Sequence, residues 1–255
     1  MKRIAGLILL FLLVAIPYIA DAQMWKLRRY EATAGITATS FYGDVGASAQ
    51  NPLLGFRTIM VGSTRPTISL GARYKITGDM AAKLNLSFGM LNGTDGGDLE
   101  HRGYSLNLTI FEPSVQFEYY LLSEGKTFST AALFNRRGML NNYSKVYVYV
   151  FGGIGGPLFF PGKYDGVTLH PYFDEFQKFA LVIPVGAGLK YSIDARWSVG
   201  FELGRRYTFT DKIDGLDTPT SERNDIYDFA TISAIYKVRT DRRGRPIFGN
   251  PYRRR

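Results

Sequence analysis

Long stretches of this chain alternate between apolar and polar residues, and the clearest one runs from Phe179 to Asp211. Two alternating runs flank a turn at Ser192 to Arg196, which predicts a β-hairpin whose strands each have one apolar face. The apolar faces carry Leu181, Ile183, Val185, Ala187, Leu189 and Tyr191 on the first strand and Trp197, Val199, Phe201 and Leu203 on the second. Each strand is long enough to cross a bilayer, which takes about 9–11 tilted residues. The hairpin alone fits a soluble sandwich as well as a membrane barrel.

The same alternation predicts six further strands. They are Tyr30–Tyr42, Thr67–Ile76, Met80–Asn92, Tyr104–Leu122, Lys145–Gly155 and Ile226–Arg239. Pro113 lies inside the fourth strand, where we expect a bulge or bend because proline cannot donate to a neighbouring strand. With the hairpin the total is eight, the smallest strand number among membrane barrels. The predicted fold is therefore all-β, an eight-stranded antiparallel transmembrane β-barrel of the outer-membrane type.

The connections between these strands alternate in length. Thr77–Asp79 and the turn near Asp194 are short. Long connections are expected at Gly43–Pro66, Gly93–Gly103, Gly156–Lys178 and Lys212–Asp225. Short turns at one end and long loops at the other are typical of outer-membrane barrels with periplasmic termini. The exception is Ser123–Ser144, which falls where a short turn is expected and is a candidate periplasmic insertion.

Charged residues fall on the small, polar faces of the predicted strands. They are Arg73, Lys75, Lys83, Glu118, Lys190, Glu202 and Arg206. In a small barrel such side chains fill the interior and pair with one another, so we expect a lumen charge network rather than an open channel. The alternative is a soluble lipocalin-like barrel, which would reverse the faces and line its interior with the aliphatic side chains.

The first residues indicate export. Lys2 and Arg3 precede an apolar run from Ile4 to Ile16, and Ala20-Asp21-Ala22 follows. A basic start, a short apolar run and a small-x-small site predict a signal peptide, cleaved before Gln23. The expected organisation is a signal peptide at 1–22, an outer-membrane barrel at 23–240 and a basic periplasmic tail at 241–255. The chain has no cysteine, which excludes disulfides, thiolate chemistry and a lipoprotein anchor.

The inventory of catalytic residue types is small. The two histidines, His101 and His170, lie in predicted loops with no paired ligand. Asp211, Asp214 and Asp217 lie close together in another loop. A loop that hydrogen-bonds within its own turn is a simpler interpretation of them than a Ca²⁺ site. The run Gly152–Gly156 ends a strand and precedes no helix, so we interpret it as close strand packing rather than a phosphate cradle. We predict no catalytic residue, no cofactor, no metal and no enzymatic activity.

The C-terminal tail is strongly basic, in a chain of formal net charge +9. The expected partner-binding residues are Arg242, Arg243, Arg245, Arg253, Arg254 and Arg255. Such a tail attracts acidic protein surfaces, and because the chain is expected to be exported we predict no nucleic-acid partner. A disordered, solubilising tail is the competing interpretation.

Several segments resemble one family of outer-membrane proteins. They are Phe41-Tyr42-Gly43-Asp44, Phe88 to Asp95, Glu112 to Tyr119, Ile183 to Tyr191 and Glu202 to Asp211. Together they resemble the PorG-like outer-membrane β-barrels of the Bacteroidota type IX secretion system, over about Tyr30 to Tyr236. In this family the Phe-Thr-Asp run is usually followed by a tyrosine and paired aspartates. After Phe209-Thr210-Asp211 this chain has that continuation only in part.

The resemblance implies a non-enzymatic role in protein secretion. Its implied partners are outer-membrane lipid and a periplasmic ring lipoprotein with its associated secretion proteins, which the barrel would anchor or organise. Two alternatives remain open from the sequence: a small general barrel that acts as a pore, adhesin or ligand-binding protein, and a lipid-modifying barrel enzyme that uses His101 or His170.

Overall fold

The computed structural model describes residues 28–42, 64–94, 103–122, 146–165, 167, 177–210, 212–215, 225–241 and 245–247. This part of the chain is built from strands. They are β1 (Tyr30–Tyr42), β2 (Arg65–Lys75), β3 (Met80–Thr94), β4 (Ser105–Leu122), β5 (Val146–Gly155), β6 (Leu158–Asp165), β7 (Val182–Ser192), β8 (Trp197–Thr208) and β9 (Ile226–Val238). Over the described ranges, no helix has the length and apolar character needed to cross a membrane.

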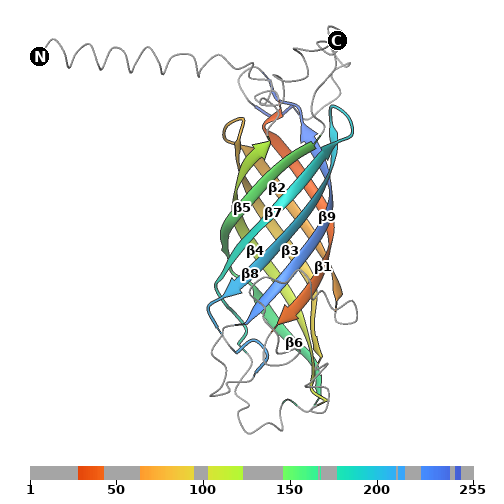
Figure 1. Cartoon of the computed structure of the whole chain (residues 1–255), viewed down its shortest axis with the longest axis vertical. Coiled ribbons are helices and arrows are strands. Elements are labelled where there is room, and N and C mark those ends of the chain that lie inside the picture. Colours follow the sequence, from red (N-terminus) through yellow and green to blue (C-terminus); the bar gives the residue numbers. More distant parts are fainter. Residues whose placement is uncertain are drawn as a thin grey trace, which may run out of the picture.

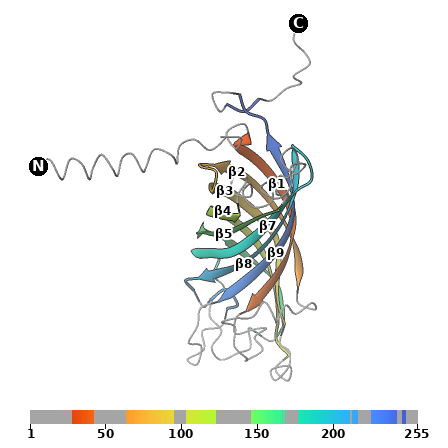
Figure 2. The same cartoon turned by 45° about the horizontal axis from the view of Figure 1, so that its top comes forward.

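The strands form one closed antiparallel barrel (Figures 1 and 2). Sequence neighbours pair around the wall, β1 pairs with β9, and the β3–β4 pairing completes the ring. β5 and β6 share a single position, because β4 pairs with β5 along Ser114–Leu122 and with β6 along Ser105–Phe111. The nine strands therefore occupy eight positions, and the prediction of an eight-stranded antiparallel barrel is confirmed.

The division between β5 and β6 corrects two expectations. Gly156–Lys178 was expected to be a loop, but Leu158–Asp165 is a strand paired with β4. The predicted bulge at Pro113 is also wrong, since the β3–β4 register runs unbroken through Leu86 and Pro113. The interruption lies in the neighbouring strand, at Gly156 and Pro157, where Pro157 has no N–H to donate. There the Gly156 N–H donates to the Pro113 carbonyl at 3.0 Å.

The two ends of the barrel differ. At one end, called here the turn end, β1 begins, β9 ends and two short turns connect β2 to β3 and β7 to β8 (top of Figure 1). The opposite end is called the loop end.

In the β7–β8 turn, the Asp194 carboxylate accepts the N–H groups of Arg196 at 2.6 Å and Trp197 at 2.7 Å. These two bonds hold the pKa of Asp194 below its usual value. The candidate insertion Ser123–Ser144 lies outside the described residues.

The outer face of the barrel is apolar and exposed. Its large aliphatic and aromatic side chains include Ile36, Ile68, Leu70, Leu84, Leu86, Val115, Ile154, Val185, Leu189, Phe201 and Ile232, each at least 40% exposed. At the turn end the outward positions carry Tyr30, Tyr74, Tyr119, Tyr191, Trp197 and Tyr236, with ring centroids 5.1 Å apart for Tyr30–Tyr74 and 5.0 Å for Trp197–Tyr236. An apolar band bordered by an aromatic girdle is the surface that a bilayer requires. The lipocalin-like alternative is wrong, because the aliphatic faces point outward.

Candidate functional site

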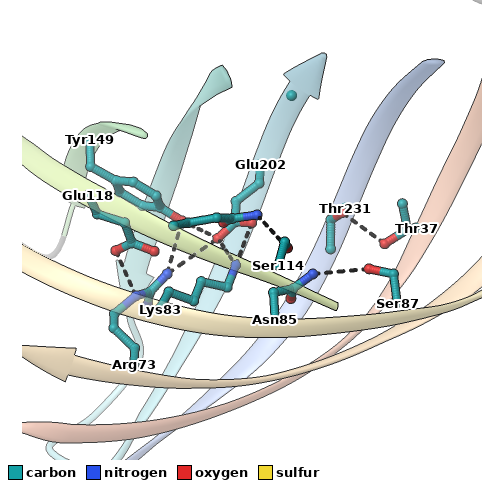
Figure 3. Close-up of polar contacts among 12 residues, drawn as sticks. Thr37, Arg73, Lys83, Asn85, Ser87, Ser114, Glu118, Tyr149, Glu202 and Thr231 are labelled. Carbon is teal, nitrogen blue, oxygen red and sulfur yellow. Dashed lines mark hydrogen bonds and ion pairs between the residues drawn. The ribbon is translucent and has the colours of Figure 1, made fainter. Parts of the chain in front are cut away.

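Arg73 on β2 lies at the centre of a buried charge network inside the turn-end half of the barrel (Figure 3). Its guanidinium contacts three carboxylates from three other strands. Nη1 lies 3.0 Å from Glu31 on β1, Nε lies 2.7 Å from Glu118 on β4, and Nη2 lies 3.3 Å from Glu202 on β8. The Nε–Glu118 contact is an ion pair whose N–H is not aligned for a hydrogen bond. One cation therefore links strands from opposite sides of the barrel.

Glu202 and Glu118 each accept a further donor, whereas Oε1 of Glu118 has no hydrogen-bond partner among the described residues. Lys83 Nζ lies 2.7 Å from both oxygens of Glu202, and the Tyr149 hydroxyl donates to Glu202 Oε1 at 2.6 Å. The Tyr120 hydroxyl donates to Glu118 at 3.0 Å. The Arg73 guanidinium also lies 5.3 Å from the centre of the Tyr149 ring. Charges removed from water are tolerated when they are paired and hydrogen-bonded in this way.

The structure places all seven predicted lumen residues inside the barrel, each at most 8% exposed. Six of them belong to the Arg73 network, since Lys75 and Lys190 both reach Glu31, at 3.3 Å and 2.6 Å. Arg206 is separate. It lies nearer the loop end, 3.5 Å from Glu112, which also accepts the Tyr227 hydroxyl at 2.7 Å.

Sequence reasoning missed several members of this interior. They are Glu31, Glu112, Tyr149, Tyr227 and Lys237. Glu31 could have been found, because it shares the inward register of Thr33 and Thr37 on β1. Tyr149 could not, since its strand alternates tyrosine with valine and neither face looks polar. Only the packing shows that the hydroxyl of Tyr149 points at Glu202.

Beyond the charge network the interior changes character. Small polar side chains come next, with Thr37 bonded to Thr231 at 2.8 Å and Asn85 to Ser87 at 3.0 Å (Figure 3). The loop-end part holds an apolar cluster that includes Phe41, Leu91, Leu106, Leu108, Ile110, Phe159, Val182, Ile213, Tyr227 and Phe229. The interior is therefore charged and polar in the turn-end half and largely apolar at the loop end. Described side chains fill the interior at both ends.

Most of the residues considered for chemistry lie outside the described ranges, and the described ones form no assembled site. Among the described residues, no group of three or more His, Asp or Glu could hold a metal ion. Asp214 is buried, whereas Asp211, Asp217, His101 and His170 lie outside the described residues. The glycine run at the end of β5 packs closely, because a Cβ on Gly153 would lie 2.2 Å from the Val115 carbonyl. This contact agrees with the interpretation of the run as strand packing.

The first part of the basic tail is folded at the turn end. Thr240 and Pro246 form a β-bridge, and the Ile247 N–H donates to the Arg239 carbonyl at 2.8 Å. The Asp241 carboxylate accepts the backbone N–H of Arg245 at 2.8 Å, and the Arg245 side chain is exposed. Arg242, Arg243, Arg253, Arg254 and Arg255 lie outside the described residues.

A closed antiparallel wall, an apolar outer band and an ion-paired interior define a transmembrane β-barrel of the outer-membrane type. The chain belongs to the family described as a domain of unknown function, DUF6089, whose profile matches residues 7–236.

Solved structures similar to this chain are also outer-membrane barrels. Neisserial surface protein A has a TM-score of 0.47 and 9% identity, with 82% of this chain and 96% of that chain covered. OprG from Pseudomonas aeruginosa has a TM-score of 0.46 and 10% identity, with 84% and 97% covered. The comparison with curated proteins finds no match. The barrel assignment rests on the strand pairing and the exposed apolar band of this chain itself.

Proposed function

We propose that this barrel is a non-enzymatic outer-membrane component of the type IX protein secretion machinery, which anchors or organises the periplasmic ring complex. The support comes from the segments that resemble PorG-like barrels, from Phe41-Tyr42-Gly43-Asp44 to the run Glu202–Asp211. In this proposal the signal peptide is cleaved before Gln23 and the turn end faces the periplasm. The partners are outer-membrane lipid around the wall and a ring lipoprotein with associated secretion proteins at the turn end.

The filled interior is the structural observation that favours an anchoring role. Arg73, Glu118 and Glu202 occupy the turn-end half, and the apolar cluster occupies the loop end. An eight-stranded barrel is just wide enough for side chains to fill it, so this interior counts against a steady pore. Because side chains occupy this interior and no cluster of His, Asp or Glu is assembled among the described residues, we infer that the barrel contributes through its surfaces.

The tail is the proposed contact surface with the secretion partner. In its folded start Thr240 pairs with Pro246 and the Ile247 N–H donates to the Arg239 carbonyl, which holds Arg245 close to the barrel. A surface held in one place loses less conformational entropy on binding than a disordered one. The exposed Arg245 side chain lies on this folded part and favours an acidic partner.

Removing the tail residues Asp241–Arg255 is expected to reduce co-purification of the ring lipoprotein by about tenfold or more, since several charge contacts of up to about 1 kcal/mol each are lost together. Barrel insertion should be unchanged, as measured by heat-dependent mobility in gels. The matched control is Lys178→Ala, which removes an exposed positive charge near the loop end. Full retention of the lipoprotein by the truncated barrel would overturn the role of the tail.

A further inference from the structure

Four arginines lie at the edge of the turn end, where β1, β9 and β8 are neighbours in the wall. They are Arg28, Arg29, Arg196 and Arg239, called here the arginine rim. β1 begins and β9 ends at a paired position, Tyr30 and Val238, so the chain segments beyond this pair lie at the same edge of the barrel. The Lys237 N–H donates to the Arg196 carbonyl at 2.7 Å, which places Arg196 beside the same end of β9. The rim therefore extends over three adjacent strands.

The rim lies against the aromatic girdle on the outer surface. Arg29 Nη1 donates to the Tyr74 hydroxyl at 3.1 Å, and Tyr74 is an outward girdle residue that is 36% exposed. Arg196 directly precedes Trp197, another girdle residue, which is 47% exposed. Aromatic girdles lie at the headgroup level of a bilayer. The guanidinium of Arg29 therefore lies at that level, and Arg196 follows the girdle on the neighbouring side.

The rim is accessible from outside the barrel. Arg196 and Arg239 are exposed, and the two rim arginines before β1 are partly exposed. Asp194, the carboxylate in the same turn as Arg196, accepts backbone N–H groups of that turn. The other short turn, Thr77–Asp79, contains no basic residue. Of the two short turns, the one at β7–β8 therefore carries the exposed positive charge, and it lies on the same side as the ends of β1 and β9.

We propose that the arginine rim binds the phosphate groups of anionic phospholipids in the leaflet at the turn end. A guanidinium matches phosphate geometry through two parallel N–H groups, and it attracts anionic headgroups at close range. Lipid is favoured over an acidic protein as the occupant, because the Arg29–Tyr74 contact places a rim cation against the lipid-facing girdle. This inference extends the proposed contact with outer-membrane lipid, and it does not depend on a role in secretion.

The test measures which lipid lies next to Trp197 in the full chain. The protein is placed in vesicles with equal amounts of anionic phosphatidylglycerol and zwitterionic phosphatidylcholine, and bromine on the acyl chains of one or the other lipid quenches a neighbouring tryptophan. Trp25→Phe leaves Trp197 as the reporter, because the chain has two tryptophans. We expect a preference of about fivefold for phosphatidylglycerol, the effect of one full arginine–phosphate attraction shared by the exposed rim.

Substitutions in the rim show whether the preference comes from these arginines. The triple variant carries Arg28→Gln, Arg196→Gln and Arg239→Gln. It should lower the preference to below about twofold, while Arg29 stays in place. The matched control is Lys178→Gln, which removes an exposed cation near the loop end and should leave the preference at Trp197 unchanged. With the unaltered rim, raising the salt concentration from about 0.1 M to about 1 M should also reduce the preference, because the Debye length shortens from about 10 Å to about 3 Å.

Equal quenching by the two brominated lipids, or quenching by neither, would show that the unaltered rim does not select anionic lipid, and the proposal would be wrong. A triple variant that keeps the full preference contradicts it as well. If the triple variant fails to fold, the salt series decides, and a preference that salt does not reduce would count against the rim. The measurement uses purified protein, so loss of ring co-purification in cells would contradict the role in secretion without changing this outcome.

Discussion

Replacing Arg73 with methionine is expected to lower the free energy of unfolding by about 3–5 kcal/mol, the range for removing one partner of a buried ion pair. The variant leaves Glu31, Glu118 and Glu202 in the interior without the cation that contacts all three. Lys83 still pairs with Glu202, but Glu118 loses its only ion-pair contact among the described residues. Urea unfolding in lipid vesicles, followed by tryptophan fluorescence, measures the difference.

Two further variants show whether the loss comes from the network. Arg239→Met removes an exposed arginine at the turn end and should change stability by at most about 0.5 kcal/mol. Arg73→Met combined with Glu118→Gln should be less destabilised than the sum of the two single variants, because the second change removes a carboxylate left without its cation. If Arg73→Met were no more destabilising than Arg239→Met, the interior would be solvated rather than tightly ion-paired.

Replacing Ile36 with arginine is expected to destabilise the protein in a bilayer by about 2–4 kcal/mol, the cost of a cation on the lipid face near the midplane. Ile36 is 68% exposed and lies beside Ile68 on β2 and Ile232 on β9, which are 61% and 62% exposed. No charged partner occurs in this row of three isoleucines. The same vesicle unfolding assay measures the effect.

The matched control for this variant is Ile247→Arg. Ile247 is 48% exposed, but it lies beyond the barrel wall in the folded part of the tail. The same substitution there should change stability by at most about 0.5 kcal/mol. Equal, small effects at both positions would mean that the apolar outer face does not contact lipid, and the membrane assignment would be wrong.

The architecture was predictable because one simple constraint acts on every strand. A bilayer requires an apolar outer face, and a filled small barrel accepts polar groups inside. Apolar and polar residues therefore alternate along each strand, and this alternation can be recognised in the sequence. Ile68, Leu70 and Tyr74 therefore point outward, while Arg73 and Lys75 point inward, as expected. The β7–β8 turn was also predictable, because Asp194 supplies the carboxylate that closes it.

The features that were not predicted depend on contacts between distant parts of the chain. Glu202 is 129 residues from Arg73, and no local pattern shows that the two meet across the interior. β6 was assigned to a loop because its sequence, with Pro161 and Gly162, lacks clear alternation, and its pairing with β4 decides its conformation. The apolar loop-end cluster likewise includes Ile213, outside any strand, which packs there only once the barrel is closed.

We propose that the barrel anchors the type IX secretion machinery through its turn end. The most direct test replaces Arg245 with a photo-crosslinking amino acid in the full chain and irradiates intact cells. Arg245 is suitable because its side chain is exposed on the folded part of the tail. We expect crosslinks to the periplasmic ring lipoprotein, identified by mass spectrometry. Crosslinks to lipid alone, or to proteins unrelated to secretion, would contradict it.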